Sequence, residues 1–354
     1  MLAQVLNFPL SGLKFHGCVQ QNARWVVNAA TITNYLIATN AVGHSFYRVS
    51  HTASINLNYF KNSCMERLKG KVAIVTGGAT GIGEAICKKF AKEGAYVIVN
   101  GFPEDPVDDV VRSIMEAGGS ARGFSADISQ EENARACVDL ARRTWGRLDI
   151  LINNAGVFPV MSEIDEYPTD AFDYMMRNNV RTAYLMTKYA IPELQKTKGC
   201  IVSAGSESGE KGLAQNAPYG GTKGWMHAFM KGVAVEQAQY GVRANCVCPG
   251  PVDTAWMHKE TGPIDKKIEK QILSATPMGR LGTVEEIANV YLFLASDEAS
   301  YVTAALFEVD GGITAAKGPV GEMAGNEAKE QPEGELKLDH TMDGATNMER
   351  GKGQ

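Results

Sequence analysis

Short apolar runs alternate with amphipathic stretches through the middle of the chain. The runs are bounded by polar or glycine-containing segments and read as strands: Val72–Val75, Tyr96–Val99, Gly123–Ala126, Asp149–Ile152, Gly199–Val202, Val242–Val247 and Leu306–Val309. The stretches between them predict helices, including Glu84–Glu93, Asp170–Glu193 and Val284–Ala295. Strands that alternate with helices predict an α/β fold, in which a single domain holds a doubly wound parallel sheet with right-handed crossovers.

A glycine-rich segment, Thr76–Gly83, joins the first strand to the first helix. Glycines in such a turn let the backbone approach a pyrophosphate, which is held at the helix N-terminus. Their spacing is Thr-Gly-x-x-x-Gly-x-Gly, which differs from the more common G-x-G-x-x-G pattern. Within a strand–turn–helix–strand unit, this segment predicts a dinucleotide site.

Tyr219 and Lys223 are four residues apart in a predicted helix and therefore share a face. A free tyrosine is a poor acid or base at neutral pH, but a neighbouring ammonium favours the phenolate and lowers the phenol pKa. Ser206, further upstream, could hold a substrate oxygen. These residues predict alcohol–carbonyl chemistry if a cofactor carries the hydride; taken alone, the pair could equally be a solvated surface pair.

The glycine spacing and the Tyr-x-x-x-Lys pair together resemble the short-chain dehydrogenase/reductase family, over about Leu68 to Ala316. The other matching motifs are Asn153-Asn154-Ala155-Gly156, Asn179 within Asn178-Asn179-Val180, Ser206 thirteen positions before Tyr219, Pro249–Thr254 and Val309–Gly312. The resemblance implies a Rossmann-like, seven-stranded sheet and an NAD- or NADP-dependent oxidoreductase acting on a small alcohol or ketone. It also implies a homodimer or homotetramer built on two long helices.

The resemblance assigns roles residue by residue. Tyr219 is expected to be the general acid/base, Lys223 to lower its pKa and hold the nicotinamide ribose, Ser206 to bind the reacting oxygen, and Asn179 to support a water. The expected cofactor contacts are Gly77, Thr80, Gly81, Ile82, Gly83, Gly101, Asp127, Ile128, Asn153, Ala155, Gly156, Tyr219, Lys223, Pro249, Gly250, Val252 and Thr254. Asp127 could instead cap the end of its strand.

The choice between NAD and NADP depends on residues after the second strand. An acidic side chain there binds the ribose hydroxyls of NAD, whereas a basic one favours NADP. The position is Gly101, which is neither, and Thr80 stands where NADP users often carry a basic residue. Glu104 and Asp105 follow and would repel a 2′-phosphate, so NAD is favoured, with NADP as the alternative.

Two features depart from the family pattern. Gly205 precedes Ser206 where the family often has a second serine, and Glu207 and Ser208 could face either substrate or solvent. The catalytic helix also carries four glycines, each costing about 1 kcal/mol relative to alanine unless close packing or a ligand requires it. They are Gly220, Gly221, Gly224 and Gly232.

Apolar residues near the site predict a partly apolar substrate pocket. Phe158, Val160 and Met161 follow the Asn-Ala-Gly segment, while Trp256 and Met257 lie in Ala255–Thr276, the mobile substrate lid of the family. For the second group, a packed pair of surface helices is the alternative. None of these residues specifies a substrate.

Composition narrows the class of protein. The chain has 354 residues and a net charge of −5 without a basic stripe, so nucleic-acid binding is not expected. No apolar run reaches the ~18 residues of a membrane helix. Cys246 and Cys248 share one face of a predicted strand and read as buried reduced thiols, and the histidines show no metal-binding spacing. A cytoplasmic enzyme without a metal is expected.

The two ends differ from the middle. Residues 1–64 contain no Asp or Glu, which suits either a transit peptide or sequence upstream of a natural start at Met65, the start of the catalytic domain 65–316. Residues 317–354 lack aromatics and are expected to be disordered, or to dock on a neighbouring subunit.

A non-catalytic dinucleotide sensor on the same fold is the rival interpretation. Such a protein would keep the glycine turn but could lose Tyr219, Lys223 or Ser206. All three are present.

Overall fold

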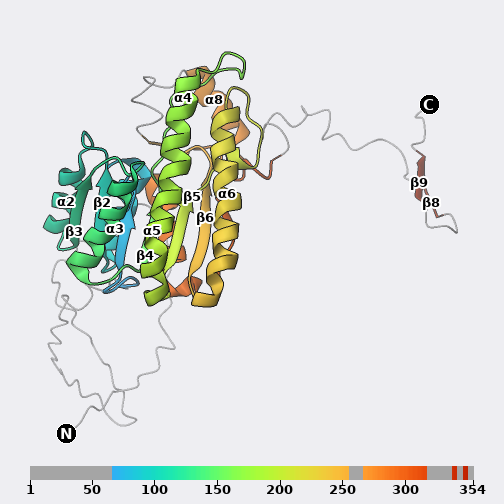
Figure 1. Cartoon of the computed structure of the whole chain (residues 1–354). Coiled ribbons are helices and arrows are strands. Elements are labelled where there is room, and N and C mark those ends of the chain that lie inside the picture. Colours follow the sequence, from blue (N-terminus) through green and yellow to red (C-terminus); the bar gives the residue numbers. More distant parts are fainter. Residues whose placement is uncertain (1–65, 255–265, 317–336, 341–345, 350–354) are drawn as a thin grey trace, which may run out of the picture. The chain divides into compact units, whose positions relative to one another are not determined.

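The computed structural model describes residues 66–254, 266–316, 337–340 and 346–349 (Figure 1). The predicted extension 1–64 and the lid residues Trp256 and Met257 lie outside these ranges. Within the tail 317–354, for which disorder was expected, Lys337–His340 (β8) and Thr346–Glu349 (β9) pair antiparallel.

Seven parallel strands form one sheet, as predicted, and their order is β3-β2-β1-β4-β5-β6-β7. They are β1 Val72–Val75, β2 Tyr96–Gly101, β3 Ser120–Ser125, β4 Ile150–Asn153, β5 Cys200–Ala204, β6 Arg243–Pro249 and β7 Leu306–Val309. β3 begins three residues earlier than its apolar run because it pairs with the whole of β2, from Tyr96 opposite Ser120 to Gly101 opposite Ser125. The sheet confirms the predicted α/β, Rossmann-like class.

Helices cover both faces of the sheet (Figure 1). On one face lie α1 Gly81–Lys92, α2 Val107–Glu116 and α9 Val284–Ala295. On the other lie α3 Glu131–Trp145, the long run α4 Thr169–Met175, η2 Met176–Arg181 and α5 Thr182–Thr197, and α6 Ala217–Gln237. Shorter elements are η3 Glu207–Gly209, η4 Ala238–Tyr240, α8 Lys266–Ala275 and η5 Asp297–Ala299.

The sheet separates two hydrophobic cores because successive side chains of a strand point to opposite faces. In β1, Ala73 and Val75 pack with α1 and α9, whereas Val72 and Ile74 pack with α3 and α5. Cys246 and Cys248 of β6 both belong to the second core and are buried as free thiols, as predicted.

The long helix predicted at Asp170–Glu193 is continuous but not regular. Its middle turn, η2, is a π-helix that contains Asn178 and Asn179, both buried. A π turn inserts an extra residue into the helix and is frequent at functional sites. The apolar periodicity of the sequence did not reveal this wider turn.

The strand order reverses at β1, which lies between β2 and β4. Connections therefore leave β1 and β4 in opposite directions, and a crevice opens beyond their carboxyl ends, where ligands bind in doubly wound sheets. The glycine turn and the Asn-Asn-Ala-Gly segment follow these two strands. Among the described residues, no helix is both long and apolar enough to span a membrane.

Candidate active site

Thr76 and Asn154 fasten the glycine turn to the end of β4. The Thr76 hydroxyl donates to Ile152 O at 3.1 Å and accepts from the backbone N–H groups of Asn154 and Ala155, both at 3.0 Å. The Asn154 side chain donates to Thr76 O and Gly77 O, both at 3.1 Å. The cofactor turn and the predicted Ala155–Gly156 contacts therefore form one hydrogen-bonded unit.

Two glycines of the turn have no space for a side chain. A Cβ on Gly83 would lie 1.9 Å from Gly77 O, and one on Gly77, which has φ +59°, would lie 2.9 Å from Ala155 Cα. Bare backbone brings the start of α1 against the turn and the turn against Ala155, so these glycines are a packing requirement as well as an allowance for a ligand.

The N-terminus of α1 suits an anionic group. Thr80, its N-cap residue, makes no side-chain capping hydrogen bond, and the first backbone N–H that bonds back is that of Glu84, to Thr80 O at 3.2 Å. Gly81, Ile82 and Gly83 come before Glu84, in the first turn of α1. The backbone N–H groups of a first turn have no partner within the helix. These residues therefore fit the pyrophosphate of a dinucleotide.

Gly101 at the end of β2 is in contact with a carboxylate from further along the chain. A Cβ on Gly101 would lie 2.9 Å from Asp105 Oδ2, which accepts from Phe102 N–H at 2.7 Å. The chain thus folds an acidic group back to the position that the sequence pattern left empty.

Asp127 and Asn153 both make hydrogen bonds within the protein. Asp127 accepts from Ser129 N–H at 2.9 Å, which is the strand-end cap considered above, and Ile128 beside it is buried. The buried Asn153 amide donates to Thr187 Oγ1 at 3.1 Å and Ser203 Oγ at 3.2 Å. Their expected cofactor contacts remain predictions.

The Pro249–Thr254 segment lies across the carboxyl ends of β6 and β7. A Cβ on Gly250 would lie 2.8 Å from Asp310 Cα, so the Pro-Gly segment and the Asp-Gly-Gly motif touch through backbone. Val252 is buried and pairs with Gly282. Thr254 lies beside Gly81: a Cβ on Gly81 would be 3.8 Å from Thr254 Cγ2.

Tyr219, Ser206 and Lys223 meet at the same edge of the sheet. The Ser206 hydroxyl lies close enough to the Tyr219 phenol to lower its pKa, so a side chain of α6 faces one that follows β5. Lys223 Nζ donates to Ala204 O at 2.9 Å and lies 5.5 Å from the centre of the Tyr219 ring. The three predicted catalytic side chains are thus one cluster.

Burial dominates the protonation of this cluster. It raises the pKa of Tyr219 to about 12, although the Ser206 hydroxyl opposes this, and the Glu207 carboxylate raises it further. Burial lowers the pKa of Lys223 to about 8. A neighbouring ammonium group was expected to lower the Tyr219 pKa. The pKa is raised instead, because a buried phenolate is costly.

Asn179 links the cluster to the loop after β4. Its Oδ1 accepts from Val157 N–H at 2.7 Å, and its Nδ2 donates to Val157 O at 2.9 Å and Thr222 Oγ1 at 3.3 Å. A Cβ on Gly156 would lie 3.3 Å from Asn179 Oδ1 and 3.9 Å from Lys223 Nζ. The π turn of η2 therefore places Asn179 beside Lys223, as the sequence motif predicts.

The residues around Tyr219 divide between the pocket and the protein interior. The Phe158 ring packs on the Tyr219 ring at 4.8 Å between centres, while Met161 is exposed. Ser208 is buried and donates its N–H to Ser206 Oγ at 3.2 Å. Glu207 is half-buried, and burial together with the Asp310 carboxylate raises its pKa to about 7.

Similar proteins identify the family. The family described as Enoyl-(Acyl carrier protein) reductase matches residues 77–314. An oxidoreductase of Bacillus subtilis, named Uncharacterized oxidoreductase YxbG, is 38% identical over 255 residues, covering 71% of this chain and 93% of that protein. The solved structure of a mutant short-chain dehydrogenase/reductase from Serratia marcescens matches with a TM-score of 0.66 and 34% identity, over 70% of this chain and 99% of its own. The chain belongs to the short-chain dehydrogenase/reductase family.

Membership of the family makes the chain an oxidoreductase that uses a nicotinamide cofactor. The relatives include a protein with a defined substrate. The 2-(S)-hydroxypropyl-CoM dehydrogenase 3 of Xanthobacter autotrophicus is 36% identical over 252 residues, covering 70% of this chain and 98% of that protein.

Sequence reasoning missed four residues of this dehydrogenase/reductase site: Thr76, Asn154, Asp105 and His227. Thr76 and Asn154 stood inside recognised motifs, so their positions were available as a signal. Asp105 was noted only as a nearby negative charge. His227 belongs to no motif, although it follows Lys223 by one helical turn and contacts the Ser206 turn.

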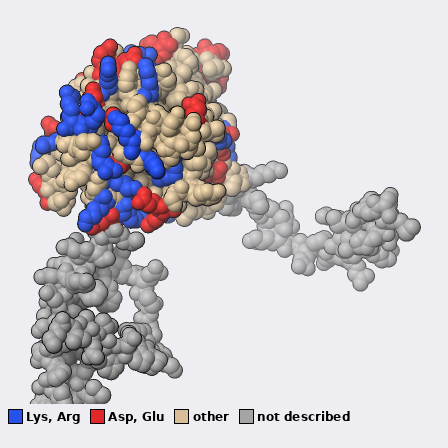
Figure 2. All heavy atoms as spheres, turned by 60° about the horizontal axis from the view of Figure 1, so that its bottom comes forward, with Lys and Arg blue, Asp and Glu red and all other residues tan. Residues whose placement is uncertain are grey.

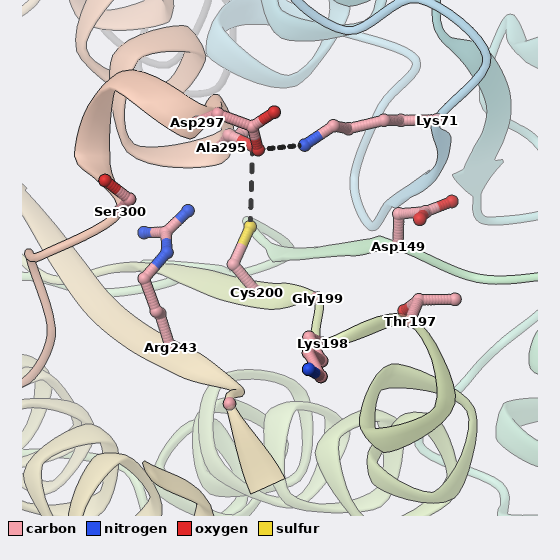
Figure 3. Close-up of a pocket in the computed structure, with 11 residues that line it drawn as sticks. Lys71, Asp149, Thr197, Lys198, Gly199, Cys200, Arg243, Ala295, Asp297 and Ser300 are labelled. Atoms are coloured by element: carbon pink, nitrogen blue, oxygen red, sulfur yellow. Dashed lines mark hydrogen bonds and ion pairs between the residues drawn. The ribbon is translucent and has the colours of Figure 1, made fainter.

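A separate cavity of about 230 Å³ lies at the opposite edge of the sheet, between the amino ends of the strands (Figure 3). Lys71 pairs with Asp297 at 2.5 Å, and Arg243 donates to Ser296 O and Val302 O. Many Lys and Arg side chains gather on the face that Figure 2 turns forward. At this side of the sheet, positive charges complement the carbonyl ends of the helices, which gives these basic residues a structural role.

Proposed function

We propose that this protein interconverts a secondary alcohol and a ketone by hydride transfer, with Tyr219 as the general acid/base. The observation that carries the proposal is the cluster of Tyr219, Lys223 and Asn179 with Ser206 beside it, next to a glycine turn suited to a dinucleotide. When bound, the nicotinamide cofactor supplies or accepts the hydride, and the protein supplies orientation and proton transfer.

Each residue of the cluster has a role that its position supports. With a pKa of about 12, Tyr219 carries its proton at neutral pH and can donate it to a ketone oxygen. The reverse reaction needs the phenolate, which the positive charge of Lys223 favours. Ser206 holds the reacting oxygen beside Tyr219, and Asn179 orders the loop next to Lys223.

We further propose that the cofactor is NAD. The Asp105 carboxylate beside Gly101 stands where an acidic group would accept hydrogen bonds from the ribose hydroxyls, and it would repel a 2′-phosphate. The acidic group comes from the turn before α2 instead of from the end of β2. NADP use would require this turn to move.

We also propose that the protein is cytoplasmic and forms a homodimer or homotetramer through α5 and α6. Large apolar side chains on these helices are exposed in the single chain, including Tyr184 at 46% and Val235 at 76%. Burying such side chains against a second copy would remove apolar surface from water.

The substrate class is tested with a panel of secondary alcohols and ketones, using NAD or NADP in parallel and following nicotinamide absorbance. The panel should include small hydroxyalkyl thioethers, sugars and cyclic diols. We expect turnover of at least one alcohol–ketone pair, faster with NAD. Tight cofactor binding without turnover of any member would instead favour a dinucleotide sensor.

A further inference from the structure

The imidazole of His227 lies inside the turn that carries Ser206. His227 follows Lys223 by four residues on α6 and is 5% exposed. The backbone N–H of Ser206 donates to its Nε2 at 3.4 Å, and Cys248 Sγ lies 3.3 Å from the same nitrogen. A side chain on α6 therefore holds the backbone of the proposed substrate-binding serine.

Two glycines make the space for this ring. A Cβ on Gly205 would lie 2.6 Å from His227 Nε2, and one on Gly209 would lie 2.5 Å from His227 Cε1. Gly205 is the residue that departs from the family pattern, where a serine is usual. The departure and the histidine explain each other, because a serine side chain at position 205 would overlap the ring.

The protonation state of the ring fits an acceptor role. Since Nε2 accepts from Ser206 N–H, a neutral ring carries its proton on Nδ1, and the Cys248 thiol can donate to Nε2 as well. Burial lowers the pKa of His227. Lys223 and Lys231 act in the same direction, whereas Glu210 opposes it, so the ring is neutral at pH 7.

We propose that His227 is a positioning residue, whose Nε2 fixes the Ser206 turn so that the Ser206 hydroxyl faces Tyr219. This inference rests on the proposed role of Ser206. His227 need not touch substrate or cofactor. Its effect on turnover passes through the orientation of one hydroxyl, and small misplacements of such groups can reduce rates by up to about a hundredfold.

The test compares His227→Leu, which keeps bulk but removes the acceptor, with His227→Gln, whose Oε1 can accept in place of Nε2. We expect the Leu variant to lower kcat about tenfold to a hundredfold, with the Kd for the cofactor unchanged, and the Gln variant to retain most of kcat. In a Ser206→Ala background, His227→Leu should add little further loss. Equal losses in the Leu and Gln variants, or a full additional loss without Ser206, would overturn the proposal.

Amide hydrogen exchange of the 205–209 turn gives a second measurement that does not depend on turnover. The Leu variant should exchange faster at this turn, and the Gln variant should resemble the wild type. Unchanged exchange in a folded Leu variant would contradict the proposal. If the wild type shows no dehydrogenase activity, the proposed function fails, and this exchange experiment still decides the role of His227. If the Leu variant does not fold, the Gln variant alone decides the test. A folded Gln variant with a lower kcat and faster exchange at the 205–209 turn would contradict the positioning role of His227.

Discussion

At the scale of residues, the motifs predicted that the proposed catalytic side chains lie together, but the surrounding protein sets their pKa values and contacts. Tyr219, Ser206, Lys223 and Asn179 converge as their spacing predicts. The predicted lowering of the Tyr219 pKa was wrong, because burial, which depends on contacts from distant parts of the chain, raises it. The contacts of Asp105 and His227 were also beyond prediction, since they depend on the path of short turns.

Cofactor discrimination is expected to depend on Asp105. Asp105→Asn keeps an oxygen to accept from Phe102 N–H but removes the negative charge beside Gly101. We expect the ratio of the Kd for NADP to that for NAD to fall about tenfold, equivalent to about 1.4 kcal/mol. Fluorescence titration of both cofactors measures it, with exposed Glu104→Gln as the control. A ratio that responds to Glu104→Gln and not to Asp105→Asn would contradict the assignment.

Glu207 should make stability depend on pH. Its pKa is about 7 in the folded chain against an ordinary value of 4.5, mainly because of burial. The folded state therefore binds the proton more tightly, and stability falls as pH rises from about 4.5 to 7. Glu207→Gln should melt at about the wild-type temperature at pH 5 and at a higher one at pH 8. A Tm difference that does not change with pH, as expected for exposed Glu163→Gln, would exclude this coupling.

At the scale of elements, the hydrophobic pattern predicted all seven strands of the parallel sheet. For α9 and β7 the predicted bounds equal the observed ones. The π turn in the long helix was not predicted, because one extra residue hardly alters an apolar pattern. The glycines of α6 divide into two groups. Gly220 and Gly224 face the backbone of the Ser206 turn, whereas Gly221 and Gly232 meet nothing within 4 Å. Close packing therefore explains two of these four glycines.

Gly220→Ala should reduce turnover by displacing the serine turn, because the new Cβ would lie 2.6 Å from Ser208 O. Gly232→Ala, in open space on the same helix, should stabilise the fold by up to about 1 kcal/mol and leave turnover unchanged. Thermal melts and kcat for both variants provide the comparison. Equal kcat values in the two variants would show that turnover does not depend on the close contact between α6 and the Ser206 turn.

At the scale of the whole molecule, the strand order places the glycine turn, the Asn-Ala-Gly loop and Ser206 beyond the carboxyl ends of the strands of a single sheet. This arrangement follows from βαβ connectivity, so the sequence predicted it well. The identity of the alcohol was not predictable, because the pocket walls come from irregular loops, and the lid residues Trp256 and Met257 lie outside the described ranges.

Assembly should depend on the exposed faces of α5 and α6. Tyr184→Glu would place a charge in the proposed contact between subunits and should shift the protein toward monomer. Light scattering after size-exclusion chromatography measures the mass. Met115→Glu, at an exposed apolar position on α2, is the matched control. A Tyr184→Glu variant with the mass of the wild type would contradict an interface at this position.

The central claim is that Tyr219 transfers the proton. The most direct measurement is kcat and cofactor Kd for Tyr219→Phe, with the fully exposed Tyr301→Phe as the control. Loss of a general acid/base typically costs about 10² to 10⁴ in rate, so turnover should fall by that factor while the cofactor Kd changes less than about twofold. Near-normal turnover in Tyr219→Phe would contradict the account.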